Sequence, residues 1–452
     1  MAVSPLKEHQ TPSQPQKLPT LHEAVLYWLK LGFISFGGPA GQIAIMHHDL
    51  VEKKRWISEK RFLHALNYCM LLPGPEAQQL ATYIGWLMHR TWGGIIAGGL
   101  FVLPSLLILI LLTWIYLAFG HLPQIAGILY GIKPAVIAIV LFAAYRIGSR
   151  VLHNGVLWGF SLAAFAAVAV FDISFPYVIL SAGLGGYLGS MIYPQKFKSR
   201  PSHTKSEATS SDAAISDDTI PSHAIFNPRH MMKVLVAGLA LWILPIALLA
   251  GYLGWEAVLT QMAWFFTKAA LLTFGGAYAV LPYVYEGAVE AYSWLTPTQM
   301  IDGLALGETT PGPLIMVVAF VGFVGGWTHA LFGSESLVLA GVTAACVVTY
   351  FTFLPSFLFI LVGGPLVEST QGNLKFTAPL TGITAAVVGV IFNLALFFTY
   401  HIVWPEGLNG DVDWFSAVYA VIALISLLFL RVGIIPLIGI SGLVGLLHHL
   451  LI

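Results

Sequence analysis

The chain has 452 residues, of which 57% are apolar and only 9% are charged, with a mean hydropathy of +0.81. Soluble proteins carry roughly 25% charged residues, so this composition excludes a soluble globular chain and predicts an all-α polytopic membrane protein. The formal net charge of zero argues against nucleic acid as a partner. The two cysteines, Cys69 and Cys346, both lie in apolar segments and cannot form a disulfide framework.

Four regions follow one another along the chain. Residues 1–20 are rich in Pro and Gln, and we expect a disordered tail without a cleavable signal peptide. We expect residues 21–194 to form a first membrane repeat, residues 195–232 a flexible polar linker, and residues 233–452 a connecting helix plus a second repeat. The expected number of spans is about ten, because nine apolar runs are near or above the length that crosses a bilayer. These runs are 94–119, 125–145, 155–171, 176–193, 234–253, 337–362, 378–400, 414–430 and 432–451.

The two repeats share a set of motifs in one register. The stretch from Lys30 to Pro75 recurs 238 positions later, and after a 13-residue insertion Leu103-Pro104-Ser105 matches Leu354-Pro355-Ser356. Duplicated membrane units are typical of secondary transporters. The matching features of the first stretch are Lys30 with Lys268, Phe36-Gly37-Gly38 with Phe274-Gly275-Gly276, Trp56 with Trp294, and Pro73-Gly74-Pro75 with Pro311-Gly312-Pro313.

The loop charges indicate how the repeats are oriented. Cations are retained on the cytoplasmic side of a membrane protein, and in the first repeat they gather in loop 51–61, at Arg90 and in a loop at 146–150. The segment equivalent to 51–61 is 284–298, which carries Glu286 and Glu290 and no Lys or Arg. We therefore expect an inverted-topology repeat; the alternative is a parallel repeat with neutral loops.

Each repeat contains two expected helix breaks. Proline removes a backbone donor and glycine loosens a helix, so Pro73-Gly74-Pro75 predicts a hairpin of two helical segments that meet at membrane depth. The helix after Pro75 would present free N–H groups and a positive dipole end, which favour an anion. The same holds after Pro313. The alternative is a tight turn used only for close packing.

Polar side chains cluster near these breaks and supply the candidate substrate site. Lys30 and Lys268 each precede Phe-Gly-Gly by six residues, where a buried cation would bind an anion and a cation near a helix end would instead snorkel to the interface. The candidate substrate-binding residues are Lys30, Gly37, Gly38, Gln42, Asn67, Pro73, Gly74, Pro75, Gln78, Gln79, Lys268, Gly275, Gly276, Thr309, Thr310, Pro311, Gly312 and Pro313.

Each repeat also carries one acid that its counterpart lacks. Glu76 aligns with Leu314, and Glu308 aligns with Met70. Burial disfavours the ionised form of a carboxyl group, so either acid is a candidate proton carrier, and the sequence does not choose between them. We expect no catalytic residues, no metal site and no cofactor, since neither metal-ligand spacing nor a nucleotide fingerprint is present.

At these motifs the sequence resembles the chromate ion transporter (CHR) family in its long, two-domain form. The resemblance extends from about residue 21 to 450 and rests on FGGPAGQ (36–42), LLPGPEAQQLATYIGW (71–86), FGGAYAVLP (274–282) and TTPGP (309–313). It implies a multi-pass protein of the inner (plasma) membrane that exports chromate from the cytoplasm, driven by the proton gradient, with the lipid bilayer as its surroundings. Sulfate, a similar tetrahedral dianion, is the alternative substrate, and a homodimer is left open.

Two other function classes compete with a transporter. An anion channel would share the pore but would need no broken-helix gates on both faces. A membrane reductase would need a redox cofactor or metal ligands, and the sequence offers neither.

Overall fold

The structure, a computed structural model, describes residues 18–197, 213–215, 221–369, 377–407 and 409–451, and within these ranges the regular elements are helices. Most of the tail expected at 1–20 and much of the linker expected at 195–232 lie outside the described residues. The first repeat contains α1 (Leu21–Ile34), α2 (Gly38–His47), α3 (Glu59–Cys69), α4 (Glu76–Phe119), α5 (Pro123–Val151), α6 (Gly155–Ala169) and α7 (Phe175–Ile192). The connecting helix is α8 (Pro228–Leu253), and the second repeat contains α9 (Val258–Leu272), α10 (Ala277–Tyr285), α11 (Pro297–Thr309), α12 (Val317–Thr328), α13 (Leu337–Ser369), α14 (Thr377–Val403), α15 (Trp414–Leu428) and α16 (Ile434–Leu451).

The backbone confirms the two-half repeat in detail. Each second helix ends in a π-helical turn, His48–Lys53 in the first half and Glu286–Ala291 in the second, 238 positions apart. Each third helix begins at an equivalent hydroxyl cap, Ser58 or Thr296, whose side chain accepts a backbone N–H. The repeat therefore extends to irregular backbone features that apolar composition alone would not produce.

The predicted breaks divide the helices where expected. Phe36-Gly37-Gly38 separates α1 from α2, and Pro73-Gly74-Pro75 separates α3 from α4. In addition, α4 is two helices, because His89 and Arg90 have non-helical backbone angles. Glycine allows the two legs of α4 to pack closely, since a Cβ added at Gly98 would lie 2.2 Å from the Thr82 hydroxyl. The sequence analysis placed Arg90 among the basic loops and began a separate apolar run at 94, and the break at His89 and Arg90 agrees with this division.

The α3 hairpin is too short to cross a membrane. Its arms are the 11 residues of α3 and the first leg of α4, residues 76–88. At about 1.5 Å per residue these arms are about 16 and 20 Å long, whereas the hydrocarbon core is ~30 Å thick. The 13-residue α11, which leads to the tip at 311–313, is likewise too short to cross.

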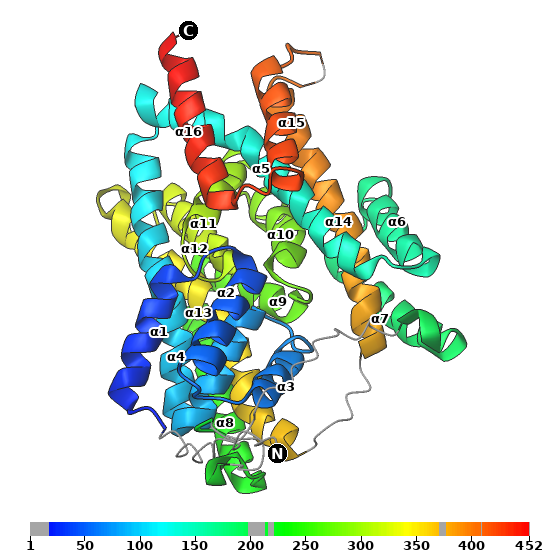
Figure 1. Ribbon diagram of the computed structural model, residues 1–452. Coiled ribbons are helices and arrows are strands. Elements are labelled where there is room, and N and C mark those ends of the chain that lie inside the picture. The colour runs from blue at the N-terminus through cyan, green and yellow to red at the C-terminus, as the bar shows by residue number, and fades with distance from the viewer. Residues whose placement is uncertain (1–17, 198–212, 216–220, 370–376, 408, 452) are drawn as a thin grey trace, which may run out of the picture.

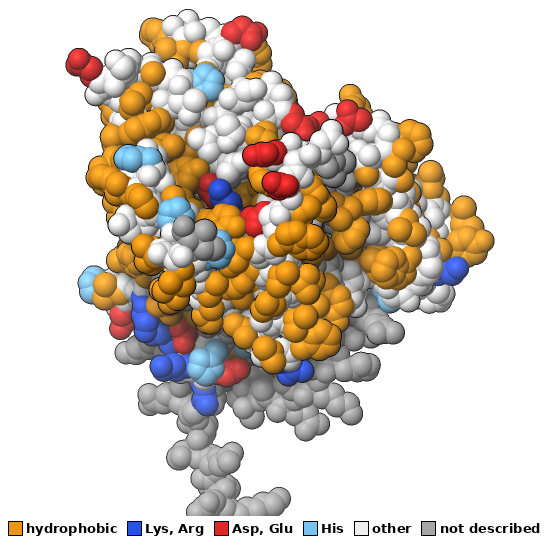
Figure 2. Space-filling model, turned by 90° about the horizontal axis from the view of Figure 1, so that it is seen from above, with side chains coloured by type: hydrophobic (Ala, Val, Ile, Leu, Met, Phe, Trp, Pro, Cys, Tyr) orange, Lys and Arg blue, Asp and Glu red, His pale blue; other side chains and the backbone are white. Residues whose placement is uncertain are grey.

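Long apolar helices surround these short elements (Figure 1). Among the described residues, 7 helices are long and apolar enough to cross a membrane, and α6, α9, α12 and α15 contribute shorter apolar helices. All nine apolar runs expected from the sequence are helical. Many large hydrophobic side chains are exposed along these helices, as contact with lipid requires, and hydrophobic side chains also cover much of the face seen in Figure 2. The chain is a multi-pass membrane protein.

The described part of the linker packs against the first repeat. Ile215 pairs with Ile57 in a parallel bridge, and its backbone N–H donates to the Trp56 carbonyl at 3.1 Å. Further on, His223 bonds the Trp86 carbonyl at 2.9 Å. The linker therefore contacts both the loop before α3 and the first leg of α4.

Candidate functional site

Each Pro-Gly-Pro tip contacts the helix break of the opposite repeat. The Gly74 N–H donates to the carbonyl of Thr273, just before Phe274-Gly275-Gly276, at 2.7 Å. The Gly312 N–H donates to the carbonyl of Ser35, just before Phe36-Gly37-Gly38, also at 2.7 Å. These reciprocal bonds pair each tip with one break of the opposite repeat. We call the surroundings of Gly74 and Thr273 the first crossing and those of Gly312 and Ser35 the second crossing.

Glutamine side chains brace both crossings. At the first, the Gln79 amide donates to the Pro73 carbonyl at 2.8 Å and to the Ser356 hydroxyl at 3.5 Å. At the second, the Gln42 amide donates to the Ser35 carbonyl at 3.3 Å and to the Gly312 carbonyl at 2.5 Å. Gln42 thus links the first repeat directly to the tip of the second.

Both tips require glycine. Gly74 has φ +128° and Gly312 has φ +100°, a region that side-chain-bearing residues rarely adopt. A Cβ at Gly74 would lie 2.3 Å from the Ser356 hydroxyl oxygen, and one at Gly312 would lie 2.9 Å from the Cβ of Ser105. Ser105 and Ser356 are the serines of the two Leu-Pro-Ser motifs, so each tip packs against that motif in the other repeat.

Several buried polar atoms at the crossings have no hydrogen-bond partner within the described part of the chain. Buried polar groups are normally paired, so a cluster of unpaired ones is a site where a polar ligand would supply the missing bonds. Serine hydroxyls can donate to an anion, and backbone N–H groups at the start of α4 would add to them. The unpaired atoms here are Ser35 Oγ, Ser105 Oγ, Gln42 Oε1, Gln78 Oε1 and Gln79 Oε1.

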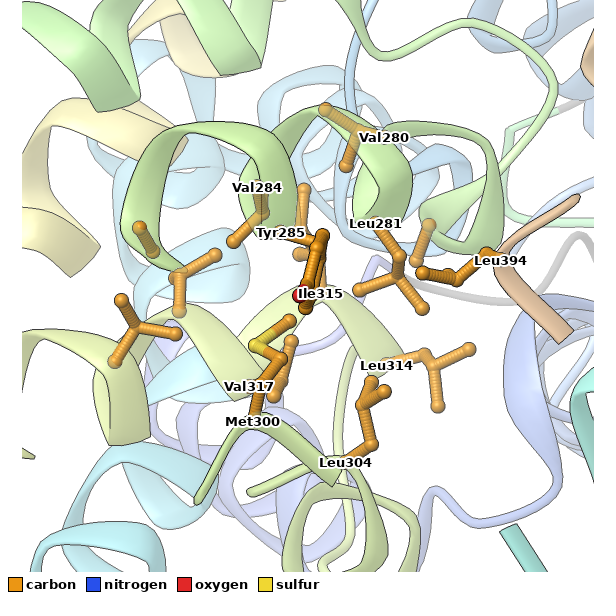
Figure 3. Packing of buried hydrophobic residues seen from close by; sticks show 14 of the residues in the cluster. Val280, Leu281, Val284, Tyr285, Met300, Leu304, Leu314, Ile315, Val317 and Leu394 are labelled. Carbon is orange, nitrogen blue, oxygen red and sulfur yellow. The ribbon is translucent and has the colours of Figure 1, made fainter. Parts of the chain in front are cut away.

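The two tips differ in polarity. After the second tip, Leu314 and Ile315 pack into an apolar cluster with Leu281 of α10 and Leu304 of α11 (Figure 3). After the first tip, the chain continues with Glu76 and, two residues later, Gln78 and Gln79. The chain that follows the first tip is therefore polar and the chain that follows the second tip is apolar, while both crossings hold unpaired polar atoms.

The two acids have separate polar neighbours. Glu308, at the end of α11, accepts a hydrogen bond from the Tyr278 hydroxyl at 2.5 Å. Glu76, the first residue of α4, is close enough to Arg150 for their charges to interact. The positive charge of Arg146 acts on the Tyr278 hydroxyl. Both acids are half-buried.

Arg146 and Arg150 lie within α5, which extends to Val151, and not in a loop as the sequence analysis had it. They are four residues apart, and residues at i and i+4 share a helix face. That spacing is the signal that would have placed both cations on one side of a helix. Sequence reasoning treated them only as markers of the cytoplasmic side.

Some candidate residues do not take part in the hydrogen bonds described at the crossings. Lys30 and Asn67 are exposed. Lys268 is half-buried, with its ammonium 5.9 Å from the ring of Trp264. The hydroxyls of Thr309 and Thr310 donate to carbonyls of their own helix, at 2.7 and 2.8 Å. The structure instead brings together Gly37, Gly38, Gln42, Pro73, Gly74, Pro75, Gln79, Gly275, Gly276, Pro311, Gly312 and Pro313, with Gln78 adjoining.

Four residues of the crossings were not among the candidates: Ser35, Ser105, Thr273 and Ser356. Ser105 and Ser356 belong to a motif that repeats in both halves. Recurrence of a polar residue inside an apolar helix was the available signal, and it was used only to establish the repeat. Ser35 and Thr273 are also repeat equivalents, directly before each Phe-Gly-Gly.

Known proteins resemble the chain over most of its length. The sequence model of the chromate transporter family matches residues 22–187 and 260–446, that is, both repeats. The chromate transport protein of Cupriavidus metallidurans is 31% identical over 373 residues, which cover 82% of this chain and 81% of that protein. The chromate transport protein of Pseudomonas aeruginosa is 34% identical over 368 residues, covering 80% and 77%. No solved structure matches the chain.

A shorter relative matches about a third of the chain. The uncharacterized transporter YwrB of Bacillus subtilis is 28% identical over 157 residues, which cover 34% of this chain and 79% of that protein. Together with the apolar helices, these similarities place the chain in the inner membrane as a multi-pass protein. Because the family model matches both repeats and the long relatives match along more than three quarters of their length, the chain belongs to the chromate transporter family.

Proposed function

We propose that this protein exports chromate from the cytoplasm and that the crossings are its substrate site. The observation that carries the proposal is the pair of reciprocal bonds between each Pro-Gly-Pro tip and the opposite helix break. This arrangement holds irregular backbone at membrane depth, which is tolerated only where protein or a polar cavity surrounds it. The choice of chromate as the substrate rests on the relatives that are named chromate transport proteins.

The chemistry of the two crossings suits a tetrahedral dianion. Free N–H groups at the start of α4 are donors at the first crossing, and the Ser35 and Ser105 hydroxyls are donors at the second. The positive charge of Arg150, an exposed residue of α5, acts on Glu76 at the start of α4. Sulfate offers the same charge and shape, so the site by itself selects a class of oxyanion, and chromate is the member that the relatives favour.

We further propose that export is coupled to protons through Glu76 or Glu308. A fixed negative charge at the first residue of α4 would compete with the substrate for the same N–H groups. Protonation of Glu76 as the anion binds would remove that conflict, and loss of the proton would help to expel the anion. Glu308, with its Tyr278 donor, is the alternative carrier.

Cellular accumulation tests the proposed export. We expect cells that produce the protein to hold less radiolabelled chromate at steady state than cells with an empty vector, and to grow at higher chromate concentrations. The Gly74→Ala variant, at equal protein level, is the control that should lose both effects. Equal chromate content in producing and non-producing cells would contradict export.

We also propose that the second repeat is inserted upside down relative to the first. Lys53 and Ala291 are repeat equivalents, both exposed, at the ends of the two π-helical turns. In a chain lacking Cys69 and Cys346, Lys53→Cys should react with an impermeant thiol reagent from the cytoplasmic side, and Ala291→Cys from the opposite side. Reaction of both from one side would show a parallel repeat.

A further inference from the structure

A buried ion pair joins the two repeats beside the first hairpin. The Arg61 guanidinium of α3 lies 3.1 Å from the Glu368 carboxylate of α13, and the Tyr83 hydroxyl donates to the other oxygen of Glu368 at 2.6 Å. Arg61 is 5% exposed and Glu368 3%. We call these three residues the Arg61 closure. It connects a hairpin arm of one repeat to the last turn of a long helix of the other.

A second polar cluster, built around a buried acid, occupies a similar place in the other repeat. The Tyr116 hydroxyl of α4 donates to the Asp302 carboxylate of α11 at 3.0 Å, and the Lys133 ammonium of α5 lies 3.7 Å from the other oxygen of Asp302. Asp302 is 2% exposed. These three residues form the Asp302 closure, which again connects a hairpin arm to the last turn of a long helix in the opposite repeat.

The two closures correspond through the internal repeat. Asp302 is the equivalent of His64, one helical turn from Arg61, and Glu368 is the equivalent of Leu117, next to Tyr116. The charges are exchanged, however: the hairpin arm carries the cation in the first closure and the acid in the second. Two unrelated structural contacts would not be expected to occupy repeat-equivalent places between the halves.

Each closure lies between a tip and the outer end of its hairpin. From Arg61 to the end of α3 is about 12 Å, and from Asp302 to the end of α11 about 10 Å, at a rise of about 1.5 Å per residue. Figure 1 shows α3 in the lower part of the molecule and α11 in the upper part. The closures therefore lie on different sides of the crossings, and both are formed in the same structure.

Buried ion pairs contribute little net stability, because the cost of desolvation offsets the attraction between the charges. The same property allows a pair to separate at low cost once water reaches both partners. We propose that the Arg61 closure and the Asp302 closure are the cytoplasmic and opposite gates of the substrate path, and that each must break for the crossings to open on its side. This inference rests on the proposed transport function and its inverted repeats.

The test measures from which side the crossings can be reached. Ser105→Cys, in a chain lacking Cys69 and Cys346, reports access in right-side-out and inside-out vesicles treated with an impermeant thiol reagent. Arg61→Gln with Glu368→Gln, and Asp302→Asn with Lys133→Met, remove each closure without leaving an unpaired buried charge. We expect the double variant of the Arg61 closure to raise labelling of the cysteine from the cytoplasmic side alone, and the double variant of the Asp302 closure to raise it from the opposite side alone. Each increase should be about tenfold, which corresponds to the loss of one charge-assisted hydrogen bond.

Matched controls separate gating from general damage. Lys60→Gln and Glu335→Gln change exposed charges and should label at the parent rate. If a paired variant is not recovered folded, Tyr83→Phe or Tyr116→Phe removes one hydrogen bond and should shift labelling to a smaller extent toward the same side. Parent rates from both sides, or an increase from the same side for both closures, would overturn the gates. Because labelling needs neither chromate nor a proton gradient, its failure is distinct from a failure of the proposed export.

Discussion

Replacing Gly74 or Gly312 by alanine is expected to abolish chromate transport while the protein still inserts and folds. Both glycines have positive φ angles, which cost a side-chain-bearing residue about 1–3 kcal/mol. The new Cβ at Gly74 would lie 2.3 Å from the Ser356 hydroxyl and 2.7 Å from the Gln79 amide, so the tip must move. A shift of ~1 Å in a binding geometry can reduce a rate on the order of 10²-fold.

The chain supplies a matched control for these variants. Gly99 lies in the second leg of α4, where an added Cβ would meet nothing within 4 Å. Gly99→Ala should therefore transport at the parent rate, because alanine also favours the helix. The measurement is initial chromate flux at equal amounts of purified protein. Parent-like flux in both Gly74→Ala and Gly312→Ala would mean that the tips do not form the site.

Neutralising the proton-coupling acid is expected to uncouple transport. Glu76→Gln or Glu308→Gln keeps the size of the side chain but holds it permanently uncharged. We expect the affected variant to lose pH-driven accumulation of chromate, while exchange of chromate at equal pH on both sides continues in part. The acid whose replacement has this effect is the carrier, and the comparison thus chooses between the two.

Exposed Glu335 provides the control, since Glu335→Gln changes the same group outside the site. Its pH-driven accumulation should equal that of the parent. If both Glu76→Gln and Glu308→Gln continue to concentrate chromate in response to a pH gradient, coupling through these acids is wrong, although the crossings could still bind the substrate.

The sequence was sufficient to predict the repeat and the positions of its breaks. Pro73-Gly74-Pro75 and Phe36-Gly37-Gly38 act on the backbone locally, so their effect does not depend on distant residues. Their recurrence 238 positions later turned each local signal into an architectural one. The apolar runs were equally informative, because length and composition decide whether a helix can cross a bilayer.

The contacts between repeats were not predictable in the same way. Arg61 and Glu368 are 307 positions apart, and Gln42 and Gly312 are 270 apart, so no sequence window contains both partners. Lys30 and Asn67 illustrate a second limit. Their motif positions suggested the site, but the face of the helix that turns inward is set by packing, and both side chains are exposed. The sequence analysis placed Arg146 in a loop because the apolar run ends at residue 145, whereas α5 continues to Val151.

Flux of radiolabelled chromate into proteoliposomes containing only this purified protein tests the central claim most directly. With an imposed pH gradient, we expect accumulation above the equilibrium level, collapse of that accumulation when a protonophore is added, and stimulation of flux by unlabelled chromate on the opposite side. Unlabelled sulfate in excess reports whether the site distinguishes the two dianions. Chromate that only equilibrates, with no response to the pH gradient and no stimulation from the opposite side, would contradict a proton-coupled transporter and indicate an anion channel.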